Sequence, residues 1–249
     1  MAIGDTHVRP SHESPFQYDV CIIGLGYVGL HTALTYFASG LSVLGIDASA
    51  DRLISVGAGM ADLTDADREQ LDQALTDDRF QMTADHATLG EARAVIICVP
   101  APVNEYFAPD LNPLKRACAT VTQHARPGQL LILTSTTYVG CTHELLVRPL
   151  AKRGLEVGQD VHVAFCAELI ESDSTTGGPD IRSFVVGGAM PTCAQRAVET
   201  LHVHTASVDE VPSLAIAEMA KLLENTFRAV STAVANDFAD IRRSMKVDT

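Results

Sequence analysis

The chain has 249 residues, a hydrophobic fraction of 47% and a formal net charge of -13, from 18 basic and 31 acidic residues. Its length and hydrophobic fraction are typical of one or two compact domains with a substantial core. The negative charge argues against nucleic acid or an anionic membrane as the main partner, because both require concentrated lysine and arginine. No stretch approaches the roughly 20 apolar residues of a membrane span, and residues 1–17 lack the apolar core of a signal peptide, so we expect a cytoplasmic protein without membrane contact.

The first predicted element is a short apolar strand, Cys21–Ile23, that runs directly into a Gly-x-Gly-x-x-Gly turn at residues 24–29. In a dinucleotide-binding turn, Gly24 allows the tight step from strand to helix, Gly26 lets the backbone approach a pyrophosphate, and Gly29 lets helix and strand pack closely. The helix that follows offers free N–H groups and a partial positive charge to the phosphates. Because this glycine pattern also occurs by chance, its meaning depends on the elements that follow.

The next strand, Leu41–Ile46, ends in Asp47, which follows Gly24 by 23 residues. In a dinucleotide fold, a carboxylate about 20 residues beyond the turn accepts hydrogen bonds from the adenosine ribose and repels a 2′-phosphate, so NAD is favoured over NADP. The alternative is that Asp47 only caps the helix that starts near Ser49. Arg52 on that helix either lies along the adenine or is solvated. The strand, glycines, helix and acid are in register, which favours nucleotide binding.

Signals of strands and helices continue in alternation after this unit. The acidic segment 61–85 predicts a helix on the surface. Largely apolar runs predict buried strands at Ala92–Val99, Leu130–Thr134, Val161–Cys166 and Ser183–Gly188. With helix-like segments between them, they predict an α/β fold with a doubly wound parallel sheet (Rossmann-like) and crossover helices. Ligands bind beyond the carboxyl ends of such strands, where the sequence places Asp47, Pro100, Ser135–Thr137 and Glu168.

The six cysteines are dispersed, with no Cys-x-x-Cys pair and no histidine cluster at ligand spacing. We therefore expect reduced thiols, mostly buried in strands, and no structural metal site. Cys141 and Cys166 lie near strand ends, but no motif or paired base marks either as a nucleophile. Both are expected to be structural.

The last segment carries apolar residues at intervals of three or four from Ile216 to Met245. They form one stripe on a helix of roughly 30 residues, about 45 Å long. A helix of that length outgrows a single sheet, so we expect its stripe to pack against a second subunit or a further domain; the alternative is that it folds back onto its own core. The expected organisation is an N-terminal tail (1–17), an NAD-binding Rossmann-like domain (18–211) and a long connecting helix (212–249), with a homodimer formed through residues 212–245.

From Tyr18 onward the chain resembles the UDP-glucose/GDP-mannose dehydrogenases, in the branch that includes UDP-N-acetylglucosamine and UDP-N-acetylmannosamine 6-dehydrogenases. The resemblance implies NAD-dependent oxidation of the C6 hydroxymethyl of a UDP-sugar to a carboxylate, through a thiohemiacetal on a catalytic cysteine, in nucleotide-sugar metabolism and polysaccharide biosynthesis. The motifs that carry it are Gly24–Leu30, Gly45–Asp47 with Arg52, Cys98–Pro102, Ser135–Tyr138 and Glu218–Thr226.

The resemblance also implies roles for individual residues. Thr136 holds the catalytic water, Glu168 is the acid/base carboxylate, Lys221 stabilises the developing oxyanion, and Asn225 binds a sugar hydroxyl. Lys221 and Asn225 are four residues apart on the predicted helix, so both face the same way, and an ammonium near an alkoxide suits this chemistry. The candidate cofactor-binding residues are Gly24, Gly26, Tyr27, Val28, Gly29, Asp47, Arg52, Val99, Pro100, Ser135 and Thr136.

Two departures from the family pattern affect this interpretation. Ala167 stands where the family has proline, and Ala101 where it has threonine. No segment of the sequence matches the family's cysteine-bearing stretch or its UDP-binding C-terminal domain. We therefore expect NAD binding, weak or absent UDP-sugar binding and no complete reaction by this chain alone. The alternatives are a catalytically inactive NAD-binding module that dimerises, and a reduced enzyme that performs only the alcohol-to-carbonyl hydride transfer.

Overall fold

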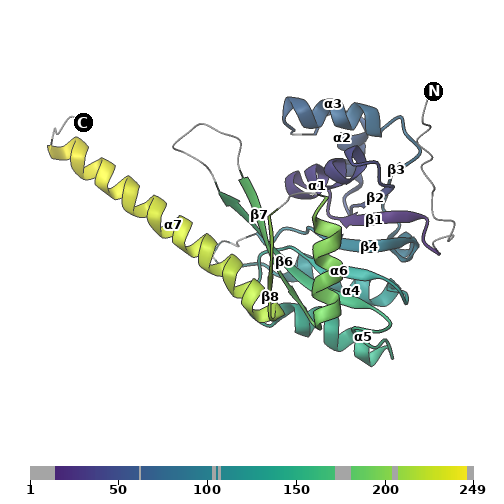
Figure 1. The fold of residues 1–249 in the computed structure, drawn as a ribbon. Coiled ribbons are helices and arrows are strands. Elements are labelled where there is room, and N and C mark those ends of the chain that lie inside the picture. Colours follow the sequence, from purple (N-terminus) through teal and green to yellow (C-terminus); the bar gives the residue numbers. More distant parts are fainter. Residues whose placement is uncertain are drawn as a thin grey trace, which may run out of the picture.

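The computed structural model describes residues 15–61, 63–102, 105, 108–171, 181–203 and 207–245 (Figure 1). Its strands are β1 (Tyr18–Ile23), β2 (Val43–Ile46), β3 (Phe80–Thr83), β4 (Ala92–Ile97), β5 (Leu130–Leu133), β6 (His162–Glu171), β7 (Ile181–Gly188) and β8 (Val208–Val211). Its helices are α1 (Tyr27–Ala38), α2 (Ala50–Gly57), α3 (Asp65–Ala74), α4 (Asn112–His124), α5 (Arg148–Lys152), α6 (Pro191–Leu201) and α7 (Leu214–Met245), with a 3-10 turn η1 (His86–Glu91) and a π-helical turn η2 (His143–Val147).

The strands form one sheet in the order β3-β2-β1-β4-β5-β6-β7-β8. Every neighbouring pair is parallel except β6 and β7. The predicted Rossmann-like α/β fold is confirmed, but the prediction that residues 183–188 continue the parallel alternation is wrong. Only nine residues separate Glu171 from Ile181, whereas a parallel connection needs a crossover of about a dozen residues or more. The chain therefore returns antiparallel.

The sequence analysis did not predict the two edge strands, β3 and β8. Each has only four residues, which is too short for a clear periodic signal. β3 lies inside the segment 61–85, which we predicted as a surface helix. Helix α3 confirms the helical part of the prediction. Asp67 and Phe80 are buried, so the segment is less exposed than its acidic composition indicates.

Each face of the sheet is covered by helices, because successive strand residues point to opposite sides. Val20 and Ile22 of β1 face a core that contains residues of α1, α3 and α6. Cys21 and Ile23 face a second core, formed with residues of α4, η2, α5 and the first turn of α7. The near-continuous apolar runs of the central strands, predicted from their composition, follow from burial on both faces.

Helix α7 leaves the body of the molecule after its first turns and projects away from it (Figure 1). Of its 32 residues, only Leu214, Ala217 and Glu218 are buried. The apolar stripe is exposed, with Leu223 at 67% and Phe227 at 72% of their full accessible surface. The alternative that this helix folds back onto its own core is therefore wrong. Within the part of the chain that is described, none of the helices combines the length and apolarity required to cross a membrane.

Candidate functional site

The turn after β1 has the geometry that its three glycines predict. Gly24 has φ +91°, in the left-handed region that favours glycine. A Cβ on Gly29 would lie 1.8 Å from the carbonyl oxygen of Gly24, whereas a Cβ on Gly26 would meet nothing within 4 Å. Gly24 and Gly29 thus serve the fold, while Gly26 borders open space that a ligand can fill.

Helix α1 begins at this turn with free donors. Gly26 is its N-cap and has no side-chain cap. Within the described residues, no protein atom accepts a hydrogen bond from the amides of Gly26, Tyr27 or Val28. Free amides at the positive end of a helix favour an anion, so the turn fits a phosphate bridge.

Asp47 points toward the glycine turn. Its Oδ2 accepts a hydrogen bond from the Leu25 amide at 2.8 Å, and its Oδ1 accepts one from the Ser49 amide at 2.8 Å. The cap of α2 is Ser49, whose side chain accepts from the Arg52 amide, so the alternative that Asp47 only caps this helix is wrong. Each carboxylate oxygen keeps further acceptor capacity for a ribose hydroxyl.

Arg52 is not simply a solvated side chain, and its position along the adenine stays a prediction. Its Nε donates to the Leu25 carbonyl oxygen at 2.6 Å, so the side chain ties α2 to the glycine turn. Together with the bond from the Leu25 amide to Asp47, this contact fixes both polar groups of one turn residue. The turn is held in shape by side chains of the second βα unit.

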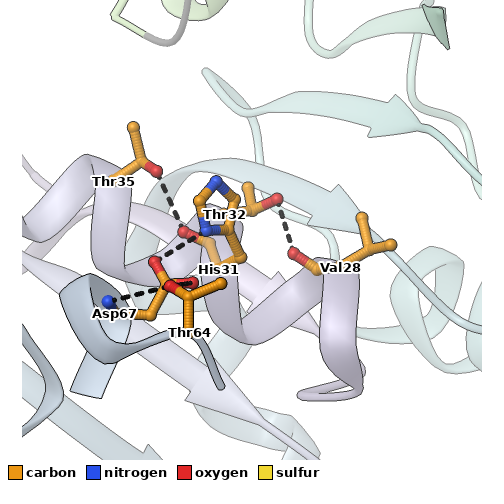
Figure 2. Close-up of polar contacts among 6 residues, drawn as sticks. All are labelled: Val28, His31, Thr32, Thr35, Thr64 and Asp67. Carbon is orange, nitrogen blue, oxygen red and sulfur yellow. Dashed lines mark hydrogen bonds and ion pairs between the residues drawn. The ribbon is translucent and has the colours of Figure 1, made fainter. Parts of the chain in front are cut away.

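A polar network that we did not predict connects α1 to α3 (Figure 2). His31 Nδ1 of α1 lies 2.8 Å from Asp67 Oδ1 of α3. Thr64 caps α3 by accepting from the Asp67 amide, and its hydroxyl donates to Asp67 Oδ2 at 2.8 Å. A threonine three residues before an acid is the sequence signal of such a cap. His31 gives no comparable signal, because its partner lies 36 residues away.

The ends of β4 and β5 are joined by hydroxyl side chains. Ser135 Oγ donates to the Val99 carbonyl oxygen at 2.7 Å, and Thr134 Oγ1 donates to the Ile97 carbonyl oxygen at 2.9 Å. Thr136 and Pro100 are exposed beyond these strand ends. Ser135 is thus engaged in holding the edge of the sheet together, while Thr136 is available at its surface.

Helix α7 brings its two candidate residues to the same edge. Lys221 Nζ donates to the Glu168 carbonyl oxygen, and Asn225 Nδ2 lies 3.4 Å from Thr136 Oγ1. Arg228, which the sequence analysis missed, donates to Asn225 Oδ1 at 2.8 Å and pairs with Glu224 at 3.1 Å. Burial lowers the pKa of Lys221, and the nearby carboxylates of Glu224 and Glu168 oppose that shift. The four catalytic candidates therefore meet beside the carboxyl end of β5. The expectation that Glu168 follows the end of its strand is wrong, because β6 continues to Glu171 and Glu168 pairs with Phe184 of β7.

The side chain of Glu168 lines a small cavity of about 20 Å³ beside Cys98, Thr134 and Cys166. That volume suffices for about one water molecule. Ala167, where the family pattern has proline, pairs with Val185 in the ladder between β6 and β7. Since proline would remove a ladder N–H, alanine lets β6 continue through Glu168.

Five of the six thiols are buried. All six cysteines are free, and only Cys98 is partly accessible. Burial raises the pKa of Cys98 and of Cys118 to about 12, and it also raises the pKa of Cys141 and Cys166. Because the thiolate is the nucleophile, these side chains fit structural roles. In the described ranges, no three His, Cys, Asp or Glu side chains gather as a possible metal site.

Comparison with known proteins agrees with this geometry. Residues 18–205 match a family model described as UDP-glucose/GDP-mannose dehydrogenase family, NAD binding domain. UDP-N-acetyl-D-glucosamine 6-dehydrogenase of Salmonella typhi is 32% identical over 237 residues, which cover 94% of this chain and 54% of that protein. The solved structure of UDP-D-ManNAc dehydrogenase from Pyrococcus horikoshii has a TM-score of 0.81 at 29% identity and aligns with 92% of this chain and 55% of that one.

A second solved structure, GDP-mannose dehydrogenase from Pseudomonas aeruginosa, has a TM-score of 0.80 at 22% identity, over 92% of this chain and 54% of that one. It shows the likeness of the fold. In each of these comparisons, the chain spans about half the length of the protein that it matches.

Proposed function

The chain belongs to the UDP-glucose/GDP-mannose dehydrogenase family, and we propose that it binds NAD at the glycine turn and holds the C6 hydroxymethyl group of a UDP-sugar beside it. The observation that carries this proposal is a convergence at one edge of the sheet. The free amides of α1 and Asp47 lie beyond β1 and β2, and the group of Thr136, Lys221 and Asn225 lies beyond the end of β5, beside Glu168 of β6. Ligands of open α/β sheets bind at this edge.

NAD fits the residues that are present. Gly26 leaves open the space that a Cβ would fill, the first amides of α1 have no protein acceptor within the described residues, and Asp47 repels a 2′-phosphate. When bound, NAD accepts the hydride that leaves the alcohol carbon. Val99, Pro100 and Thr136, at the ends of β4 and β5, are the proposed neighbours of its nicotinamide half.

The side chains at this edge are suited to the alcohol. Glu168 takes the hydroxyl proton, and the ammonium of Lys221 stabilises the negative charge that develops on the oxygen. Thr136 holds a water through its exposed hydroxyl. Asn225 donates to a sugar hydroxyl through its amide nitrogen, while its amide oxygen accepts from Arg228. Relatives named for UDP-N-acetylglucosamine and UDP-N-acetylmannosamine favour an N-acetylated UDP-hexosamine as the substrate.

The chain's own thiols do not suit the second oxidation. Oxidation to the carboxylate through a covalent thiohemiacetal requires an accessible thiolate. Burial raises the pKa of Cys98 and Cys166, which line the cavity beside Glu168, and of Cys141, which follows β5. We therefore propose that residues 1–249 bind NAD but do not by themselves produce a uronic acid, and that their affinity for UDP-sugars is weak.

Calorimetry and product analysis test both parts of this proposal. The purified chain should bind NAD at least tenfold more tightly than NADP, and mass spectrometry should detect no uronic acid after incubation with NAD and UDP-N-acetylglucosamine or UDP-N-acetylmannosamine. Absence of NAD binding would overturn the cofactor assignment. Steady conversion to the carboxylate would overturn the proposed limit and would implicate one of the six thiols.

The exposed stripe of α7 supports the proposal that residues 212–245 form a homodimer beside an NAD-binding domain of residues 18–211. Exposed apolar stripes of this extent mark interaction surfaces. The double substitution Leu223→Glu and Phe227→Glu should convert a dimer to a monomer in analytical ultracentrifugation. The unfolding free energy of the monomeric domain should change by less than about 0.5 kcal/mol, because both side chains are exposed. A wild-type chain that sediments as a monomer would contradict the dimer.

A further inference from the structure

Glu218 is a buried carboxylate on α7 that the mechanism above does not use. It is 1% exposed, and it is the only charged residue among the three buried residues of α7. Within the described residues, no basic side chain forms an ion pair with it. A buried charge without hydrogen bonds is strongly unfavourable, so its partners must satisfy it completely.

Those partners belong to one short segment after β5. Glu218 Oε2 accepts from the Gly140 amide at 2.6 Å. Its Oε1 accepts from the Thr142 amide at 2.8 Å and from Thr142 Oγ1 at 2.7 Å. Gly140 has φ +95°, in the left-handed region that suits glycine. Both carboxylate oxygens are therefore engaged, by donors only two residues apart.

The donors sit at the start of a helical segment. The Glu144 amide donates to the Gly140 carbonyl oxygen, so the helical turns that continue through η2 and α5 begin here. Amides at a helix start are otherwise unpaired and carry partial positive charge. Glu218 thus caps this helix from a different element and fastens α7 to the segment that follows Thr136.

Lys221 and Asn225 follow Glu218 by three and seven residues. On an α-helix these offsets place all three side chains on one side, about 4.5 Å and 10.5 Å along the axis. With Glu218 fixed, Lys221 reaches the Glu168 carbonyl oxygen and Asn225 reaches Thr136. Of the buried residues of α7, which are Leu214, Ala217 and Glu218, only Glu218 has a polar side chain.

We infer that Glu218 is a positioning residue: its bonds to Gly140 and Thr142 set the placement of Lys221 beside Glu168 and of Asn225 beside Thr136. The importance of that placement for catalysis rests on the proposed function. The placement itself can be measured without NAD or sugar, so its failure is distinguishable from failure of the proposed function, which NAD binding tests separately.

The pKa of Lys221 distinguishes a positioning role of Glu218 from a direct effect of its charge. Loss of a nearby negative charge lowers the pKa of a lysine, whereas release of a buried lysine into water raises it. Burial is the largest cause that lowers the pKa of Lys221, and Glu218 is not among the charges that shift it. Glu218→Gln should therefore raise the pKa of Lys221 toward its ordinary value if the helix is released.

Dimethyl-lysine NMR can measure this pKa, because the chain has only four lysines: Lys115, Lys152, Lys221 and Lys246. Glu224→Gln is the matched control, since Glu224 lies on the same helix and its charge raises the pKa of Lys221. The control should lower that pKa, and Glu218→Gln should raise it. Hydrogen exchange at the Gly140 and Thr142 amides should also accelerate roughly tenfold or more in Glu218→Gln, as expected for loss of charge-assisted bonds.

Two outcomes would overturn the inference: a pKa of Lys221 that falls in Glu218→Gln as it does in Glu224→Gln, or unchanged exchange at Gly140 and Thr142. NAD binding within about twofold of wild type should show that the variant remains folded. If Glu218→Gln does not fold, Thr142→Val removes one donor and keeps the carboxylate. It should produce a smaller rise in the same pKa, and a pKa that stays constant or falls would equally overturn the inference.

Discussion

The glycine turn and helix α7 hold the two halves of the site, and they differ in the sequence separation of their contacts and in their burial. Around the turn, the contacts of Asp47 and Arg52 join residues 22 and 27 positions apart, and seven of the twelve residues of α1 are buried. On α7, the contacts of Lys221 and Asn225 reach 53 and 89 positions back, and only three of 32 residues are buried. The cofactor half is built into the core, whereas the half that we propose for the sugar depends on a few polar contacts of a largely uncovered helix.

The largest expected effect comes from the turn itself. Gly29→Ala places a Cβ 1.8 Å from the Gly24 carbonyl oxygen, so backbone must move. We expect a loss of about 3 kcal/mol or more in unfolding free energy, measured by urea denaturation.

Gly26→Ala is the matched control for this substitution, because its Cβ meets nothing within 4 Å. Its unfolding free energy should stay within about 0.5 kcal/mol of wild type, while calorimetry should show an NAD affinity at least tenfold weaker, since the methyl group enters the space assigned to the pyrophosphate. Equal stability of the two variants would contradict the packing described for Gly29. Unchanged NAD affinity in Gly26→Ala would contradict the location of the phosphates.

Asp47→Ala should produce the next largest effect, and it acts on affinity. The carboxylate accepts from the Leu25 and Ser49 amides and is assigned to the ribose hydroxyls. Removing an ionised acceptor costs about 1.5–3 kcal/mol, so we expect NAD to bind roughly tenfold to hundredfold more weakly, with a reduced preference over NADP. Asp51→Ala, at an exposed acid in the first turn of the following helix α2, should leave both affinities unchanged. A preference for NAD that survives Asp47→Ala would remove Asp47 from the site.

The two halves also differ in how far the sequence predicts them. Gly24, Gly29 and Asp47 could be predicted because local backbone geometry and strand order restrict which residues fit. The contacts of Arg228 and Glu218 could not, because they depend on where α7 crosses the ends of distant strands. The antiparallel direction of β7 was missed for a related reason. Its apolar run is compatible with either strand direction, and the length of the connection from β6 determines which one forms.

A moderate effect on stability is expected where α3 braces α1. In Asp67→Asn, one amide must replace a carboxylate that is close to His31 and accepts from Thr64. The Asp67 side chain is only 8% exposed, so we expect a loss of about 1–3 kcal/mol in unfolding free energy. Asp72→Asn, at an exposed position of the same helix, should change it by less than about 0.5 kcal/mol. Equal effects of the two substitutions would show that this network does not stabilise the packing of α3 against α1.

The smallest expected effect is a pH dependence on the α7 side. Burial lowers the pKa of Lys221 from its ordinary value of 10.5, so the folded state releases this proton at a lower pH than the unfolded state does. Between the two pKa values the unfolded state binds more protons, and stability therefore rises with pH in that window. Below the folded-state pKa both states are protonated, and the contribution is constant.

Lys221→Met should remove this rise, because methionine fills a similar volume and does not titrate. Urea denaturation over a series of alkaline pH values should show wild type gaining stability relative to Lys221→Met as the pH approaches 10.5. Lys152→Met, at an exposed lysine, should run parallel to wild type. A Lys221→Met curve that also stays parallel to wild type would mean that Lys221 is fully solvated. The contacts of α7 would then be too loose to hold an ammonium against the ends of the strands, and the contrast between the two halves would be greater still.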